Sequence, residues 1–180
     1  MNRALELENQ LVEEAKVNPE RFALLYDKYF EQIYRYVMRR VNDVDTAQDL
    51  VSQSFFDALS HIKSYTFKGY PFSAWLYKIA HNNVLKWYRE NGKYQKVDIE
   101  EIAELKGGDD VEGELNVLQD RSGVRELMER LEYEDRELIR LKYFEEASNI
   151  EIGDIMGITA NNVGVKLYRA LKRLKQLMIN

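Results

Sequence analysis

The sequence contains no cysteine, and its 180 residues include only two histidines and two prolines. The absence of cysteine excludes disulfides, thiolate metal sites and cysteine nucleophiles, and His61 and His81 cannot form a metal centre without many carboxylates. We therefore expect neither a metal nor another cofactor. No apolar run approaches the ~18 residues that span a bilayer, and the N-terminus lacks the cationic start and apolar core of a signal peptide. These absences predict a cytoplasmic protein without membrane insertion.

Helix-breaking residues are also few, since two prolines and nine glycines serve the whole chain. Apolar residues recur every three or four positions, which favours helices. With 45% hydrophobic and 32% charged residues, the composition is typical of a soluble globular protein. We predict an all-α fold with two small helical domains, at residues 1–92 and 123–180, joined by an acidic linker at residues 93–122.

The net charge of −5 is distributed unevenly along the chain. Residues 98–120 hold nine acidic residues against one lysine, which is a charge of −8 and leaves +3 for the remainder. The last expected helix has five cations and no acid between Lys166 and Lys175. This asymmetry is typical of a surface that binds a polyanion.

In the first domain the spacing of apolar residues predicts a helix over residues 20–42, with Phe22, Leu25, Tyr29, Ile33 and Val37 on its buried face. A second helix is expected from Val44 to Ile62, with Asp43 or Asp45 as its cap. After a loop with Gly69 and Pro71, a third helix is expected from Phe72 to Glu90, and Asn91 and Gly92 form its stop signal. Three or four helices are expected after Gly123.

The segment NIEIGDIMGITANNVGVKLYRAL has the spacing of a helix-turn-helix. Gly153 has no side chain where the second helix crosses closely, Gly157 can adopt the positive φ of a tight turn, and Val163 returns to the core. Thr159 is placed to cap the second helix. The alternative is a helical hairpin whose charged face is merely solvated.

The last helix has an apolar stripe from Val163 to Met178 and an opposite polar stripe. Arg and Lys neutralise phosphates, and residues near the helix start can reach base edges. The residues assigned to duplex DNA are Thr159, Asn161, Asn162, Lys166, Arg169 and Arg173.

Phe67 and Tyr70 stand in the loop beside Lys68, where no helical period demands a ring. Exposed rings beside cations suit single-stranded nucleic acid, because a base that stacks on an aromatic ring contributes ~1–3 kcal/mol. A loop that turns both rings inward is the alternative. On the following helix Trp75, Tyr77 and Trp87 are expected to pack in the fold, whereas Lys78, Asn82, Lys86 and Arg89 make a polar, mostly cationic side.

These motifs resemble a known family. FKGYPFSAWLYKIAHNNVLKWYRENGK resembles the promoter-melting segment of bacterial sigma factors of the sigma-70 class, and AQDLVSQSFFDAL resembles their polymerase-binding helix. The C-terminal helix-turn-helix resembles the domain that reads the minus-thirty-five element. Two such domains on a short tether point to the extracytoplasmic-function (ECF) group.

The resemblance implies a protein that binds core RNA polymerase, directs it to promoter DNA and helps to open the minus-ten region. It implies that Asp49, Leu50, Gln53 and Phe55 meet the polymerase, although Gln53 and Ser54 stand where an acid and a threonine are common. An anti-sigma factor is a further partner that such proteins commonly have. The residues implied at the minus-ten element are Phe67, Lys68, Tyr70, Lys78, Asn82, Lys86 and Arg89.

The same resemblance places the helix-turn-helix residues over the minus-thirty-five element, although Gly164 and Val165 replace a more usual polar pair. The acidic linker either mimics RNA in a polymerase channel or is simply solvated. One rival function is a stand-alone helix-turn-helix regulator of transcription. Another is an enzyme, but nothing arranges a nucleophile with a base or a phosphate-cradling glycine loop, so we expect neither catalysis nor a small-molecule substrate.

Overall fold

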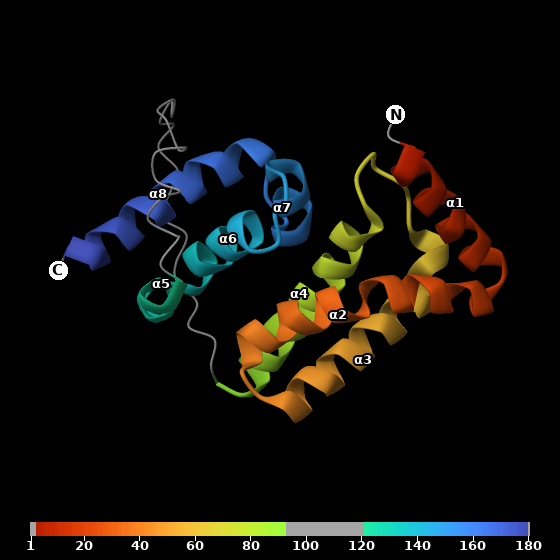
Figure 1. Ribbon diagram of the computed structural model, residues 1–180, viewed down its shortest axis with the longest axis horizontal. Coiled ribbons are helices and arrows are strands. Elements are labelled where there is room, and N and C mark those ends of the chain that lie inside the picture. The colour runs from red at the N-terminus through yellow and green to blue at the C-terminus, as the bar shows by residue number, and fades with distance from the viewer. Residues whose placement is uncertain (1–2, 93–120, 180) are drawn as a thin grey trace. The chain divides into compact units, whose positions relative to one another are not determined.

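The structure is a computed structural model that describes residues 3–92 and 121–179, and all regular secondary structure in these ranges is helical. The chain divides into two compact units. The first is built from α1 (Arg3–Val17), α2 (Phe22–Val41), α3 (Val44–His61) and α4 (Phe72–Glu90), and the second from α5 (Arg121–Glu129), α6 (Tyr133–Tyr143), most of α7 (Asn149–Met156) and α8 (Ala160–Ile179) (Figure 1). The all-α prediction is confirmed. The predicted linker, residues 93–122, lies outside the described residues except for its last two positions, which begin α5.

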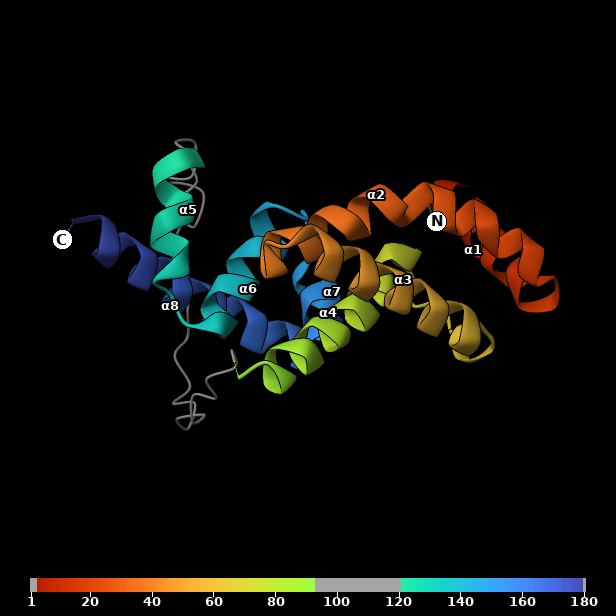
Figure 2. The ribbon, with the colours of Figure 1, turned by 90° about the horizontal axis from the view of Figure 1, so that it is seen from below.

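In the first unit α3 packs against both α2 and α4, so that the three helices share one core (Figure 2). The five residues predicted to line the inner face of α2 are all buried, as are Val51 of α3 and Leu76 of α4. Burial of one such aliphatic side chain stabilises the fold by about 1.5–3 kcal/mol. This shared core fixes the direction of α4, which carries the predicted minus-ten residues.

The ends of these helices follow local sequence signals. The Asp43 carboxylate accepts a hydrogen bond from the Thr46 amide at 2.8 Å, so Asp43 rather than Asp45 caps α3. Asn42, which closes α2, has a φ of 52° and so stands in the left-handed conformation. Gly92 follows α4 with a φ of 63°, in agreement with the predicted stop signal.

Helix α1 was not predicted from the sequence. Val12 and Ala15 are its buried apolar residues, and Glu8 is buried on the same helix. It packs on α2 and on the short 3-10 turn Ile62–Ser64 that follows α3. The apolar stripe of α1 is short, and Glu8 stands on the buried face in place of an apolar residue. The helical periodicity of α1 is therefore weak in the sequence.

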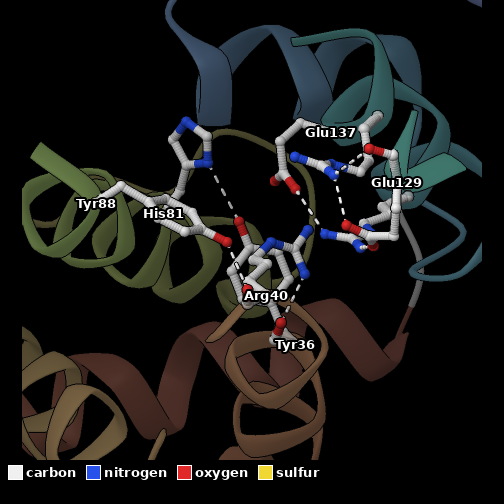
Figure 3. A network of polar contacts seen from close by, with 8 residues as sticks. Tyr36, Arg40, His81, Tyr88, Glu129 and Glu137 are labelled. Atoms are coloured by element: carbon white, nitrogen blue, oxygen red, sulfur yellow. Dashed lines mark hydrogen bonds and ion pairs between the residues drawn. The ribbon is translucent and has the colours of Figure 1, made fainter. Parts of the chain in front are cut away.

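A polar network joins the end of α2 to the middle and end of α4 (Figure 3). The Tyr36 hydroxyl lies 3.3 Å from Nδ1 of His81, and the Tyr88 hydroxyl donates to the Arg40 carbonyl oxygen at 2.5 Å. The Arg40 guanidinium donates to the Tyr36 carbonyl oxygen at 2.6 Å and lies over the Tyr36 ring. Because these groups are largely buried, their hydrogen bonds hold α4 in one register against α2.

In the second unit both α5 and α6 pack against α8, and charged side chains also link α5 to α6. Glu129 of α5 accepts hydrogen bonds from Arg136 at 2.6 Å and from Arg140 at 2.7 Å (Figure 3). Val163, Leu167, Ala170, Leu171 and Leu174 form the buried stripe of α8. The buried part of the predicted apolar stripe ends at Leu174, because Met178, the last residue of that stripe, is 42% exposed.

Candidate nucleic-acid interfaces

The loop before α4 begins after Ser64 and ends at Pro71, without regular secondary structure. It contains Phe67, Lys68 and Tyr70, and Gly69 has a φ of 85°, a conformation that favours glycine. The Phe67 ring is partly exposed. The loop therefore presents two partly exposed rings, Phe67 and Tyr70, beside an exposed lysine.

The polar side of α4 has the orientation that helical spacing predicts. Asn82, Lys86 and Arg89 are exposed, and Lys78 lies one turn before Asn82. The side chain of Asn82 has no hydrogen-bond partner among the residues that the structure describes, so the side-chain amide is available as both donor and acceptor. A strip of cations around one amide suits a phosphate backbone with a single base beside it.

The other rings of α4 are structural, as predicted. Tyr77 is buried, with its ring centroid 4.9 Å from that of Tyr36, and its hydroxyl accepts a hydrogen bond from Gln32 at 2.7 Å. The Trp75 ring lies 5.3 Å from both Tyr65 and Phe72, so it packs between the two ends of the loop. Trp75 and Trp87 keep part of their surface exposed.

Helix α3 exposes a different ring from the one that the sequence suggested. Phe55 is 4% exposed and packs against Tyr26 at 4.7 Å between ring centroids, so it cannot contact a partner on the surface. Phe56, the next residue, is 65% exposed. A shift of one residue turns a helical side chain by 100°, which decides between the core and the surface. Phe56 is thus the large ring that sequence reasoning missed.

Some polar side chains of α3 have a hydrogen-bond partner within the first unit, and others have none among the described residues. Asp49 and Gln53 are exposed and Leu50 is half-buried. Gln53 donates to Asp57 at 2.7 Å, and Asp57 also accepts from Asn83 of α4 at 3.0 Å. Asp49, one turn before Gln53, is an exposed acid on this face that a basic partner can reach.

A buried carboxylate lies at the start of α4. Glu8 of α1 accepts hydrogen bonds from Lys28 at 2.5 Å, from the Tyr29 hydroxyl, and from the Phe72 amide at 2.6 Å. Burial acts to raise the pKa of Glu8, but these hydrogen bonds and the Lys28 charge outweigh it, so the pKa is lowered and the side chain is ionised. The burial of Tyr65 and the nearby charges of Glu8 and Glu13 raise the pKa of that tyrosine to about 12.

In the second unit the turn between α7 and α8 has the geometry that its glycines predict. Gly157 has a φ of 73°, and a Cβ on Gly153 would lie 2.6 Å from the Ile158 carbonyl oxygen. The Thr159 hydroxyl accepts a hydrogen bond from the Asn162 amide at 3.2 Å, which caps α8. The two glycines and the Thr159 cap are separate observations, and each supports the predicted helix-turn-helix.

The cations of α8 are not equally available. Lys166 is paired with Glu134 at 2.7 Å and Arg173 with Asp135 at 2.5 Å, both acids of α6. These pairs orient the two side chains, and a phosphate would have to compete with the acids. Arg169 is half-buried, whereas Asn161 at the helix start is exposed.

One exposed line of α8 passes through residues that the sequence analysis did not select. Tyr168 is 45% exposed, and Lys172 and Lys175 are exposed on the turns that follow. With Asn161 these residues are spaced by seven, four and three positions, so they share one face. The sequence signal for this face was a tyrosine, Tyr168, among the lysines and arginines of the helix.

None of the described helices combines the length and the hydropathy needed to cross a bilayer.

The two units correspond to two family models. The model of sigma-70 region 2 matches residues 25–94, and the model of sigma-70 region 4 matches residues 121–174. The RNA polymerase sigma factor YlaC of Bacillus subtilis is 32% identical over 157 residues, which are 86% of this chain and 90% of that protein. The ECF RNA polymerase sigma factor BldN of Streptomyces coelicolor is 32% identical over 174 residues, 94% of this chain and 65% of the relative.

Solved structures share the fold. CnrH in complex with the cytosolic domain of CnrY has a TM-score of 0.68 at 19% identity, and covers 95% of this chain and 96% of CnrH. The sigma factor RpoE from Bartonella quintana, in complex with the anti-sigma factor NepR, has a TM-score of 0.63 at 20% identity, with coverage of 87% and 96%. At these identities the likeness is one of fold.

Proposed function

Since the chain belongs to the sigma-70 family of RNA polymerase sigma factors, we propose that it binds core RNA polymerase, directs it to particular promoters and helps to open the minus-ten region. The observation that carries this proposal is the presence of both regions in one chain, each with an exposed face suited to nucleic acid. Catalysis stays with the polymerase. The chain supplies specificity, and it works where the polymerase works, in the cytoplasm.

The exposed face of α3 is proposed to meet the polymerase. Phe56 offers an unpaired apolar ring, and Asp49 offers a charge that a basic partner can neutralise. Aromatic anchors surrounded by polar groups commonly carry most of the binding energy of an interface. Phe55 supports this face from below, through its contact with Tyr26.

The loop and the polar side of α4 are proposed to hold one extruded base of the minus-ten element. Phe67 would stack on the base, and Asn82 would read its edge. Lys86 and Arg89, which are exposed on the same side, would hold the phosphates of that strand. The stacking energy, about 1–3 kcal/mol, is of the size needed to offset unstacking.

Helix α8 is proposed to read the minus-thirty-five element in the major groove. Asn161, near the capped start of the helix, and Tyr168 are the exposed side chains placed to reach base edges. Lys172 and Lys175 would neutralise phosphates. Residues 93–122 tether the two interfaces, so that binding of one raises the effective concentration of the other on the same promoter.

A regulatory partner is also proposed. RpoE from Bartonella quintana was captured with an anti-sigma factor, and this supports an anti-sigma factor as a partner of the present chain. Such a partner would compete with polymerase for the same surfaces. Binding of one would then exclude the other in a purified mixture.

The test is transcription by purified core polymerase on a genomic library, with and without the chain, with new start sites mapped. New start sites together with stable co-purification are expected. A stand-alone regulator would bind duplex DNA without forming a polymerase complex, so absence of the complex under gentle conditions would reject the proposal. Promoter binding should also weaken steeply with added salt, because phosphate contacts release counterions.

The base-holding loop is tested with Phe67→Ala and Asn82→Ala. Both variants should open a duplex promoter more slowly than the wild type and act nearly normally on a template already mismatched at the minus-ten element. Opening is followed by permanganate reactivity of thymines, and polymerase binding is measured as the control. Equal losses on both templates would contradict base trapping.

A further inference from the structure

Both ends of the loop before α4 are held by the same helix, α1 (Figure 1). The first attachment is a hydrogen bond from the Lys16 ammonium to the Tyr65 carbonyl oxygen at 2.8 Å. The second is the hydrogen bond from the Phe72 amide to the Glu8 carboxylate at 2.6 Å. The residue range between these two attachments, 66–71, contains every loop residue assigned above to the minus-ten element.

The attachment at Glu8 replaces a cap that α4 otherwise lacks. Pro71 precedes the helix and offers no side-chain oxygen, so the Phe72 amide would have no side-chain partner of its own segment. Glu8 supplies the acceptor from another helix, and its negative charge is favourable beside a helix N-terminus. Lys28 and Tyr29 hold the carboxylate in place from α2. The start of α4 is thus fixed by two other helices, directly by α1 and indirectly by α2.

The attachment at Lys16 fixes the other end of the loop. Its side chain is 19% exposed, its ammonium lies 5.8 Å from the centre of the Tyr65 ring, and it also pairs with Glu13 at 2.7 Å. The Tyr65 ring in turn packs against Phe72 at 5.1 Å and Trp75 at 5.3 Å. The two anchor points are therefore in contact with each other through these rings.

We propose that α1 is a brace that fixes both ends of the base-holding loop, and that Glu8 and Lys16 are positioning residues for promoter opening. A loop whose ends are fixed loses less conformational entropy when its ring stacks on a base, so the bound geometry is prepared in advance. This inference rests on the proposed function. Helix α1 ends before residue 25, where the region 2 match begins, so the brace lies outside the matched segment.

The two anchors are removed separately by Glu8→Met and Lys16→Met, each of which removes the hydrogen-bonding group and keeps about the length of the side chain. Glu6→Met on the same helix and Lys63→Met near the loop are the matched controls, because both residues are exposed. Tyr29→Phe is a further variant, since it removes one hydrogen bond to Glu8 but leaves the Phe72 attachment. Thermal unfolding shows which variants are folded at the assay temperature.

Trp75 provides a readout of the brace without polymerase. The chain has two tryptophans, and in a Trp87→Phe background the emission comes from Trp75 alone, whose ring contacts both loop ends. Removal of either anchor should shift this emission to longer wavelength as the ring gains water, and the controls should leave it unchanged. Unshifted emission in both anchor variants overturns the brace.

The second readout is the rate of promoter opening by core polymerase with each variant of the full chain. Each anchor variant should open a duplex promoter about tenfold more slowly, the factor for about 1.4 kcal/mol, which is typical of one lost hydrogen bond. On a template mismatched at the minus-ten element the loss should be below about twofold, because no base has to be extruded from a duplex.

The outcomes separate the brace from the function on which it rests. Shifted emission with a loss confined to duplex templates supports the proposal. Shifted emission with equal loss on both templates, or with no loss, overturns the role of the brace in opening. If even the wild type gives no transcription with core polymerase, the proposed function fails, whereas the emission of Trp75 still reports on the anchors.

Discussion

Gly153→Ala gives a direct test of the helix-turn-helix, because the structure determines what the added methyl group would meet. A Cβ at this position would lie 2.6 Å from the Ile158 carbonyl oxygen and 3.3 Å from the Ala160 amide nitrogen. Both atoms belong to the backbone of the turn and the start of α8, so neither can rotate away. The turn would have to open, and with it the orientation of α8 would change.

The size of the effect follows from two opposing contributions. Overpacking costs about 1–3 kcal/mol, and a 2.6 Å contact with backbone atoms puts this substitution in the upper half of that range, about 2–3 kcal/mol, whereas alanine regains about 1 kcal/mol of helix propensity over glycine. The expected net loss is about 1–2 kcal/mol, which for a unit of this size lowers the melting temperature by roughly 4–16 °C. Gly164→Ala is the matched control. Its Cβ would meet only the Asn149 amide nitrogen at 3.7 Å, an ordinary contact, so it should keep or raise stability.

The assay is thermal unfolding of the full chain, followed by circular dichroism and by tryptophan fluorescence. Both tryptophans, Trp75 and Trp87, lie in the first unit. The fluorescence transition should therefore not move, whereas the circular dichroism transition of the second unit should move to lower temperature. Binding of a minus-thirty-five duplex should weaken with it. A Gly153→Ala variant as stable as the wild type would refute the close crossing of α7 and α8.

Three further predictions concern single side chains. The pKa of Glu8 is lowered because its hydrogen bonds outweigh its burial, so the stability that its charge contributes is present above the ordinary value of 4.5 and is lost as pH falls below it. Acid should therefore lower the melting temperature of the wild type more steeply than that of Glu8→Gln, and parallel curves of melting temperature against pH would contradict this. Phe56→Ala should weaken polymerase binding while changing stability by less than about 0.5 kcal/mol, whereas Phe55→Ala should cost about 3–5 kcal/mol in chemical denaturation; the opposite ranking would reverse the assignment of core and surface. Lys172→Ala should reduce the salt dependence of duplex binding by about one unit of slope, as expected for one phosphate contact, and an unchanged slope would remove Lys172 from the interface.

Local signals in the sequence were sufficient wherever one residue and its near neighbours decide the conformation. Asp43 caps α3, Gly92 closes α4 and Gly157 adopts the positive φ that the turn requires. Each of these outcomes depends on the backbone within a few residues, and local sequence can specify it. The periodicity of α2 likewise identified its buried face.

The sequence predicted that the two proposed nucleic-acid faces exist, but it predicted less well which side chains on each face are accessible. Periodicity indicated which face of α8 is polar, but the pairing of Lys166 and Arg173 with acids of α6 depends on residues more than thirty positions away. The exposure of Tyr168 depends in the same way on how α6 covers the helix. On α3 the sequence analysis assigned Phe55 to the exposed face, but the exposed ring belongs to Phe56, the next residue along the helix.

The sequence by itself determined the helices other than α1, the caps of α3 and α8, the tight turn at Gly157 and the order of motifs that identifies the family, because these are set by short-range geometry and composition. Only the tertiary structure decided that α1 exists as a packed element and that Glu8 and Lys16 reach the two ends of one loop. Glu8 is 64 positions from Phe72 in the chain. A hydrogen bond across that separation depends on how the helices pack, and no local pattern records it.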